Sequence, residues 1–64
     1  MTGSEEQLRR LKNTVMGAGH RLSLLAKSGE LEPDAGRELG EIASELAEAA
    51  RRLGRLLAAL QVER

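Results

Sequence analysis

The sequence predicts an all-α fold in which two helices form an antiparallel hairpin that dimerises into a four-helix bundle. Apolar residues recur at alternating intervals of three and four in two long stretches, the spacing of helices that bury one seam against other helices. One short break, which contains Gly29 and Pro33, separates the two stretches. Leucine and alanine dominate the apolar residues, and the chain has no Phe, Tyr or Trp, a composition typical of helical bundles.

The first predicted helix covers residues 5–27. Ser4 is a suitable N-cap, and Glu5 with its neighbour places carboxylates where the helix dipole favours them. Lys27 suits the C-terminal turn, and Gly29 can adopt the left-handed conformation that ends a helix. The predicted seam of this helix consists of Leu8, Leu11, Val15, Ala18, Leu22 and Leu25.

The second predicted helix covers residues 33–61 and follows a loop at 28–32. Pro33 fits the first turn, where its missing N–H costs nothing. This helix is the longer of the two, so its last leucines extend past the start of the first helix and need a partner chain to cover them. Its predicted seam consists of Ala35, Leu39, Ile42, Leu46, Ala49, Leu53, Leu56 and Leu60, with Leu57 beside it.

A second strip of small residues runs along the second helix, next to the seam. Glycine inside a helix costs about 1 kcal/mol relative to alanine, so two glycines in one strip predict that another helix approaches closely there. The alternative is sequence drift at a weakly constrained surface. The close-packing strip consists of Gly40, Ala43, Ala47, Ala50 and Gly54.

The length of 64 residues allows one domain, and two helices give it only a thin core. Single cores of this size rarely contribute more than about 3–5 kcal/mol and usually need a further stabilising element. The chain has no cysteine and a single histidine, so neither a disulfide nor a structural metal is expected, and no cofactor is predicted. Self-association is the route to stability that remains.

Charge is arranged in blocks although the formal net charge is zero. Residues 1–29 carry a net charge of +3, residues 30–48 carry −6, and residues 49–64 carry +3. An antiparallel dimer would lay basic ends over acidic ends, whereas a parallel dimer would stack like charges. The basic clusters near the open end are either solvated surface or an RNA-binding patch that lacks aromatic partners; they consist of Arg9, Arg10, Lys12, Arg51, Arg52 and Arg55.

His20 is the one side chain that titrates near neutral pH. The heptad phase places it opposite the seam, where a lone histidine is usually a surface residue. A phosphoacceptor role would need a carboxylate to orient the ring, and its sequence neighbours supply none.

No arrangement of nucleophile, base and acid is present, so we expect no enzymatic activity. The chain lacks an apolar run long enough for a membrane span and a signal-peptide pattern, which predicts a cytoplasmic protein without membrane contact.

Residues 8–17 resemble the helix of sensor histidine kinases that carries the phosphoacceptor histidine. The similarity to their dimerisation and phosphotransfer hairpin continues to about residue 63. The resemblance implies a dimeric four-helix bundle that docks on a receiver domain. Arg9 stands at the phosphoacceptor position and Arg10 at that of its acidic neighbour. Because arginine neither accepts a phosphoryl group nor acts as a base at neutral pH, the resemblance implies a degenerate, non-catalytic hairpin.

Residues 22–34 and the total length are also similar to the Rop family of plasmid copy-number regulators. That resemblance implies an antiparallel hairpin dimer that binds paired RNA loops through its first helix. A designed helical bundle without a natural function is a third possibility, and phosphotransfer through His20 is a fourth. The principal prediction is a homodimeric protein-interaction module, with a receiver domain or another protein as its partner.

Overall fold

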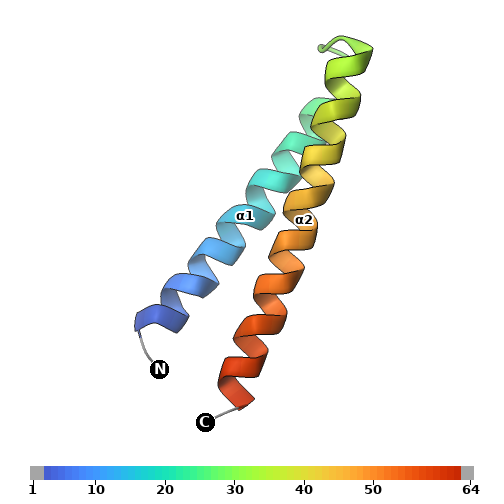
Figure 1. The fold of residues 1–64 in the computed structure, drawn as a ribbon. Helices are drawn as coiled ribbons and strands as arrows, with labels where there is room; N and C mark the ends of the chain where they lie inside the picture. Colours follow the sequence, from blue (N-terminus) through green and yellow to red (C-terminus); the bar gives the residue numbers. More distant parts are fainter. Residues whose placement is uncertain (1–2, 63–64) are drawn as a thin grey trace.

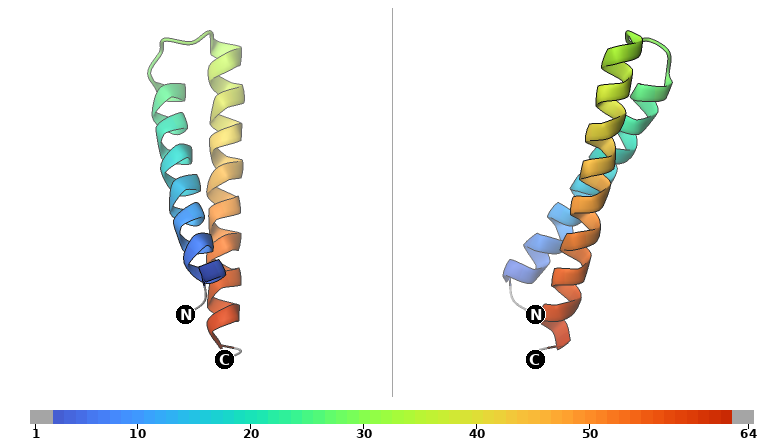
Figure 2. Two further views of the ribbon diagram at one scale, coloured as in Figure 1. Left: turned by 90° about the vertical axis from the view of Figure 1, so that its left-hand side faces the viewer. Right: turned by 45° about the vertical axis from the view of Figure 1, so that its right-hand side comes forward.

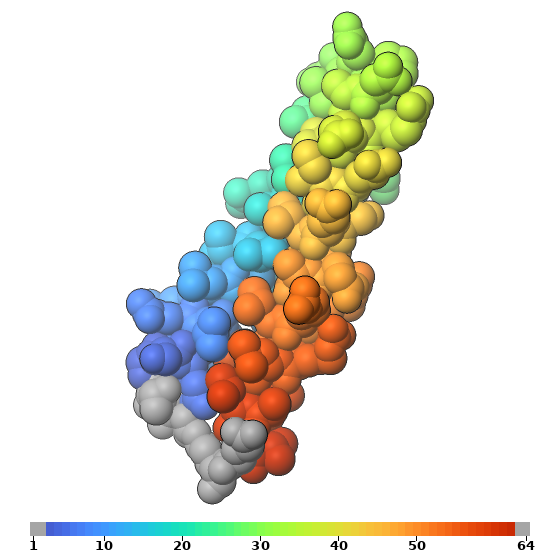
Figure 3. Space-filling model, in the orientation of Figure 1, coloured from blue at the N-terminus to red at the C-terminus, as the bar shows by residue number. Residues whose placement is uncertain are grey.

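The computed structural model describes residues 3–62, which form two helices and a short connection. Helix α1 covers Gly3–Lys27 and α2 covers Pro33–Val62. The helices lie side by side and run in opposite directions, as both Figure 1 and the further views in Figure 2 show. The molecule is a narrow rod of 48 × 15 × 11 Å, and Figure 3 shows its elongated outline. The predicted all-α, two-helix hairpin is confirmed.

The start of α1 differs from the sequence prediction. The helix begins at Gly3, so Ser4 lies inside the first turn and is not the N-cap. The other helix ends fall within one residue of their predicted positions, at Lys27, Pro33 and Val62. The ends at Lys27 and Pro33 have strong local signals, whereas the first turn of α1 contains several residues that tolerate either state.

The connection between the helices is held by local hydrogen bonds. Gly29 has a φ of +83°, the left-handed conformation that glycine adopts at little cost. The Ser28 hydroxyl donates to the Leu25 carbonyl oxygen at 2.7 Å, and its Oγ accepts from the Glu30 amide at 3.1 Å. At the start of α2, the Gly36 amide donates to the Glu32 carbonyl oxygen at 2.8 Å. The chain therefore reverses within five residues.

Small residues form the line along which the helices approach most closely. A Cβ atom on Gly19 would lie 3.4 Å from the Leu46 Cβ and 3.5 Å from the Ala43 carbonyl oxygen. Nearer the loop, a Cβ on Gly36 would lie 3.3 Å from the Ala26 carbonyl oxygen. The apolar residues buried within the described chain are Ala43, Ala50 and Leu57.

This line of contact corrects the expected position of the leucine seam. The sequence prediction placed the seam at the centre of the hairpin. Leu46 does lie at the contact with Gly19, but most seam residues lie to one side of it. The buried residues of α2 are Ala43, Ala50 and Leu57. Each follows a seam residue by one position in the sequence and so lies on the neighbouring side of the helix. Because small side chains let the two backbones come together, most of the larger leucines lie at the edge of the interface, whereas Leu57 is buried.

Candidate functional site

The displaced seam forms a continuous apolar surface on one side of the hairpin, which we call the leucine face. Helix geometry places the seam residues of both helices on the same side of the plane through the two axes. Its half-buried members are Leu8, Val15, Ala18, Leu22, Leu39, Leu46, Leu53 and Leu60, and its exposed members are Leu11, Leu25, Ala35, Ile42, Ala49 and Leu56.

Large side chains of the leucine face are open to solvent. Leu11 is 57% exposed, Leu25 41%, Ile42 39% and Leu56 46%. These residues are spread over both helices and most of their length. Soluble monomers rarely leave a contiguous apolar surface of more than a few hundred Å² uncovered, so the leucine face is the strongest candidate for an interaction surface.

The core beneath this face is small. No side chain of the described residues is fully buried, and the three buried apolar residues include two alanines. Much of the apolar surface that stabilises a larger domain is thus still in contact with water in a single hairpin. The hairpin gains most if another apolar surface covers the leucine face.

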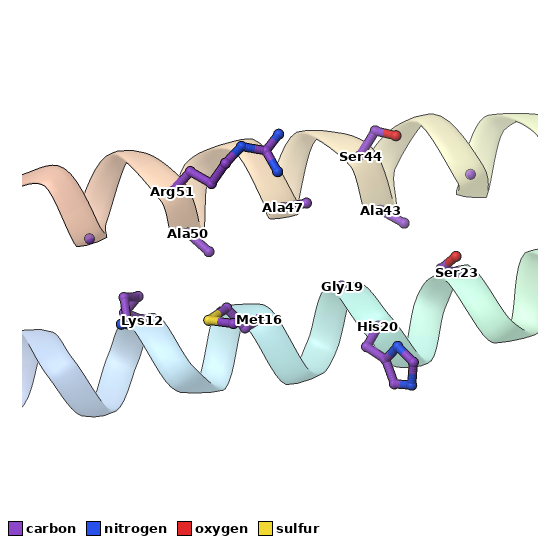
Figure 4. Close-up of a pocket in the computed structure, with 12 residues that line it drawn as sticks. Lys12, Met16, Gly19, His20, Ser23, Ala43, Ser44, Ala47, Ala50 and Arg51 are labelled. Atoms are coloured by element: carbon purple, nitrogen blue, oxygen red, sulfur yellow. The ribbon is translucent and has the colours of Figure 1, made fainter.

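The side of the hairpin opposite the leucine face carries a shallow groove of about 540 Å³. Figure 4 shows Ala43 and Ala50 of α2 directed toward α1, and Ala47 also lines this groove. A Cβ on Gly40 would meet no atom within 4 Å, and one on Gly54 would reach only the Lys12 side chain, at 3.8 Å.

The close-packing strip predicted from the sequence is therefore divided. Ala43 and Ala50 are buried and pack in the hairpin itself. Gly40, Ala47 and Gly54 are half-buried and line the groove. The helix that approaches the strip closely is α1 of the same chain, and it does so at Gly19.

The basic residues of the open end are partly neutralised within their own helices. Arg9 and Arg10 lie 3.0 Å and 3.8 Å from carboxylate oxygens of Glu6. Arg51 and Arg55 lie 2.7 Å and 3.8 Å from those of Glu48.

The pKa of Glu48 is lowered by these neighbours. The hydrogen bond from Arg51 is the main cause, followed by the positive charge of Arg51 and, more weakly, those of Arg55 and Arg52. Lys12 faces the groove. Four of the six basic residues therefore lie beside a carboxylate: Arg9, Arg10, Arg51 and Arg55.

His20 is exposed, and its ring points away from α2 (Figure 4). Within residues 3–62, no group of three or more His, Cys, Asp or Glu side chains is placed to hold a metal ion. In the same part of the chain, neither helix combines the length and the apolar character needed to cross a membrane.

The sequence prediction missed the burial of Glu5, which is 6% exposed. Glu5, Lys12 and Gly19 recur every seven residues on the contact side of α1, as Ala43, Ala50 and Leu57 do on α2. The interval of seven residues, shared by both helices, was the sequence signal that could have identified this contact. It was obscured because the stronger leucine pattern lies beside it.

The fold and this surface define a two-helix hairpin with one uncovered leucine face. Comparison with protein families, with curated proteins and with solved structures finds no significant match to the chain. The resemblances to the histidine-kinase hairpin and to the Rop family remain predictions.

Proposed function

We propose that this protein is a non-catalytic dimerisation and protein-interaction module. The leucine face of one copy packs against that of a second copy and completes a four-helix bundle. The observation that carries the proposal is the solvent exposure of Leu11, Leu25, Ile42 and Leu56 along one side of both helices.

A second copy suits this surface in shape and in chemistry. The leucine face is two helices wide and extends along a 48 Å rod, so a partner must also present two parallel rows of apolar residues. A second copy of the chain presents the same two rows of apolar residues. In a two-fold symmetric dimer each contact occurs twice, and full burial of one leucine contributes about 1.5–3 kcal/mol.

The distribution of charge is compatible with self-association. The formal net charge is zero, so two copies do not repel one another as a whole. Arg9, Arg10, Arg51 and Arg55 of the open end are paired with Glu6 or Glu48. The chain has no aromatic residue on which a base could stack. These features favour a protein partner over RNA.

The resemblance to kinase hairpins supports the same dimer and suggests a receiver domain as an additional partner. Arg9 and Arg10 replace the residues that would carry the chemistry, so docking would take place without phosphotransfer. Such docking would leave the leucine face in place as the dimer contact.

Two adjacent leucines of α1 provide a matched test of the dimer. Leu25 belongs to the leucine face, whereas Leu24 is 56% exposed on the outer side of the same helix. Sedimentation equilibrium of the full chain should show a dimer at micromolar concentration. Leu25→Lys should raise its dissociation constant by about 10-fold or more, because burial of the exposed part of the side chain is lost twice.

Leu24→Lys introduces the same charge one residue away and should leave the dimer intact. Circular dichroism establishes that both variants are still helical. A folded wild-type monomer at these concentrations, or equal effects of the two substitutions, would contradict the proposal.

A further inference from the structure

We infer that the two copies of the dimer lie antiparallel, with the loop end of each hairpin over the open end of the other. This inference rests on the proposed function, because it specifies how two leucine faces meet. It follows from the way charge is divided along the rod.

The two halves of the hairpin carry opposite charge. The loop half, residues 18–47, has three basic and six acidic side chains, a net charge of −3. The open half, residues 3–17 and 48–62, has six basic and three acidic side chains, a net charge of +3. Each hairpin is therefore an electric dipole along its 48 Å axis.

Most of this separation lies within α2. Residues 33–48 carry five acidic and one basic side chain, and residues 49–62 carry three basic side chains and no acidic one, so the halves of α2 have net charges of −4 and +3. Helix α1 carries +1 over residues 3–17 and +2 over residues 18–27. Two copies of α2 that run in opposite directions therefore place opposite net charges side by side. Both halves of α1 carry a net positive charge.

Two symmetric arrangements bring the leucine faces together. With the two-fold axis across the rods, α2 packs on α2 of the partner in reverse, and each −4 half lies beside a +3 half. Helix α1 then packs on α1 of the partner, where the +1 half lies beside the +2 half, a smaller repulsion. With the axis along the rods, α2 packs on α1 of the partner, so the −4 half lies beside +2 and the +3 half beside +1. The antiparallel arrangement therefore has the stronger attraction.

The apolar contact is similar in the two arrangements, since the seams of both helices extend along the whole face. Exposed ion pairs contribute little individually. When two alternatives bury the same apolar surface, however, charge complementarity decides between them. Salt screens these interactions with a Debye length of about 10 Å at 0.1 M, so low ionic strength should sharpen the preference.

Spin labels measure the orientation directly, because the chain has no cysteine and a single introduced cysteine takes the only label. Leu31 lies in the loop and Gln61 in the last turn of α2, both exposed and outside the leucine face. In an antiparallel dimer of Leu31→Cys, the distance between the two labels should be comparable with the 48 Å length.

A mixture of labelled Leu31→Cys and labelled Gln61→Cys should instead add a short distance, about two helix diameters or 20 Å. Sedimentation of the same samples establishes that each variant is dimeric. A short distance between two Leu31→Cys labels would overturn the orientation and leave the proposed dimer standing. A monomer would overturn both.

A charge-reversal cycle gives an independent test. Glu45 and Arg52 border the exposed edge of α2 two turns apart, too far to pair within one helix. Glu45→Arg and Arg52→Glu should each weaken the dimer several-fold at low salt, and the double variant should return to within about twofold of the wild type. Additive losses would contradict the antiparallel arrangement, since only that arrangement brings position 45 of one copy near position 52 of the other.

Discussion

At the scale of single residues, the best-defined polar contact is the pair formed by Glu48 and Arg51 on α2. Arg51 donates to the same Glu48 oxygen from Nε at 3.1 Å and from Nη2 at 2.7 Å. Arg55 approaches the other carboxylate oxygen at 3.8 Å. These interactions favour the charged carboxylate and so lower the pKa of Glu48. The pair lies on the outer surface of α2, away from the leucine face.

Arg51→Ala should raise the pKa of Glu48 toward its ordinary value of 4.5, measured by NMR titration of the side-chain carboxyl. The folded-state pKa is below the ordinary value, so the contribution of Glu48 to stability is present above pH 4.5 and is lost as the pH falls through the folded-state value. Arg37→Ala, which removes a similar pair with Asp34, should leave Glu48 unchanged. An unaltered pKa in Arg51→Ala would show that the hydrogen bond is not its cause.

At the scale of the helices, the glycines have different roles. A Cβ on Gly17 would meet no atom within 4 Å, whereas a Cβ on Gly36 would press on the Ala26 carbonyl oxygen at 3.3 Å. Gly36 thus permits the close approach of the helices beside the loop. Gly17 has no such role within the hairpin and only lowers the helical propensity of α1.

Gly17→Ala should increase the free energy of unfolding by about 1 kcal/mol, measured by urea denaturation. Gly36→Ala should give no comparable gain, because the propensity benefit is offset by the contact with a backbone oxygen that cannot move aside. Equal stabilisation by both substitutions would contradict the tight contact at the loop end.

The helices were predictable from the sequence because their signals are local. Gly29 and Pro33 bracket the connection, and the alternation of three and four identifies each helix. The contact between the helices was less predictable, since a second column lies beside the leucines on each helix and that of α1 is largely polar, with Glu5, Lys12 and Gly19. The sequence prediction favoured the column of leucines, which is the more hydrophobic. The folded chain uses the column of Gly19, Ala43 and Ala50, because close approach depends on side-chain size.

The choice between two neighbouring columns on each helix also made the candidate site hard to predict. The seam residues were identified from their spacing, but their exposure depends on which column closes the hairpin. Had the leucines met at the centre, Ile42 and Leu56 would be covered within one chain. Their exposure of 39% and 46% is a property of the packed pair of helices and is absent from the pattern of either helix alone.

At the scale of the whole molecule, the hairpin is a thin rod, and the proposed dimer would supply the interior that a single copy lacks. Its shortest dimension is 11 Å, about the diameter of a single helix, so one face of each helix is always near the solvent. Covering the leucine face converts two layers of helix into a bundle with an interior. Folding and association are then thermodynamically linked.

The melting temperature should therefore rise with protein concentration, measured by circular dichroism over a 100-fold range. Leu25→Lys should melt at a lower temperature that does not depend on concentration over the same range. A wild-type melting temperature that stays constant would mean that a single hairpin supplies all of the stability.

The short connection at 28–32 also determines the order in which the chain folds. The first contact across the hairpin, between Gly36 and Ala26, closes a loop of only about ten residues, which takes roughly 10–100 ns. Later contacts, such as Gly19 with Ala43, extend the pairing outward from the loop, each adding little further loop-closure entropy. The leucine face would therefore form within one chain, and in the proposed dimer the meeting of two such hairpins would be the bimolecular step.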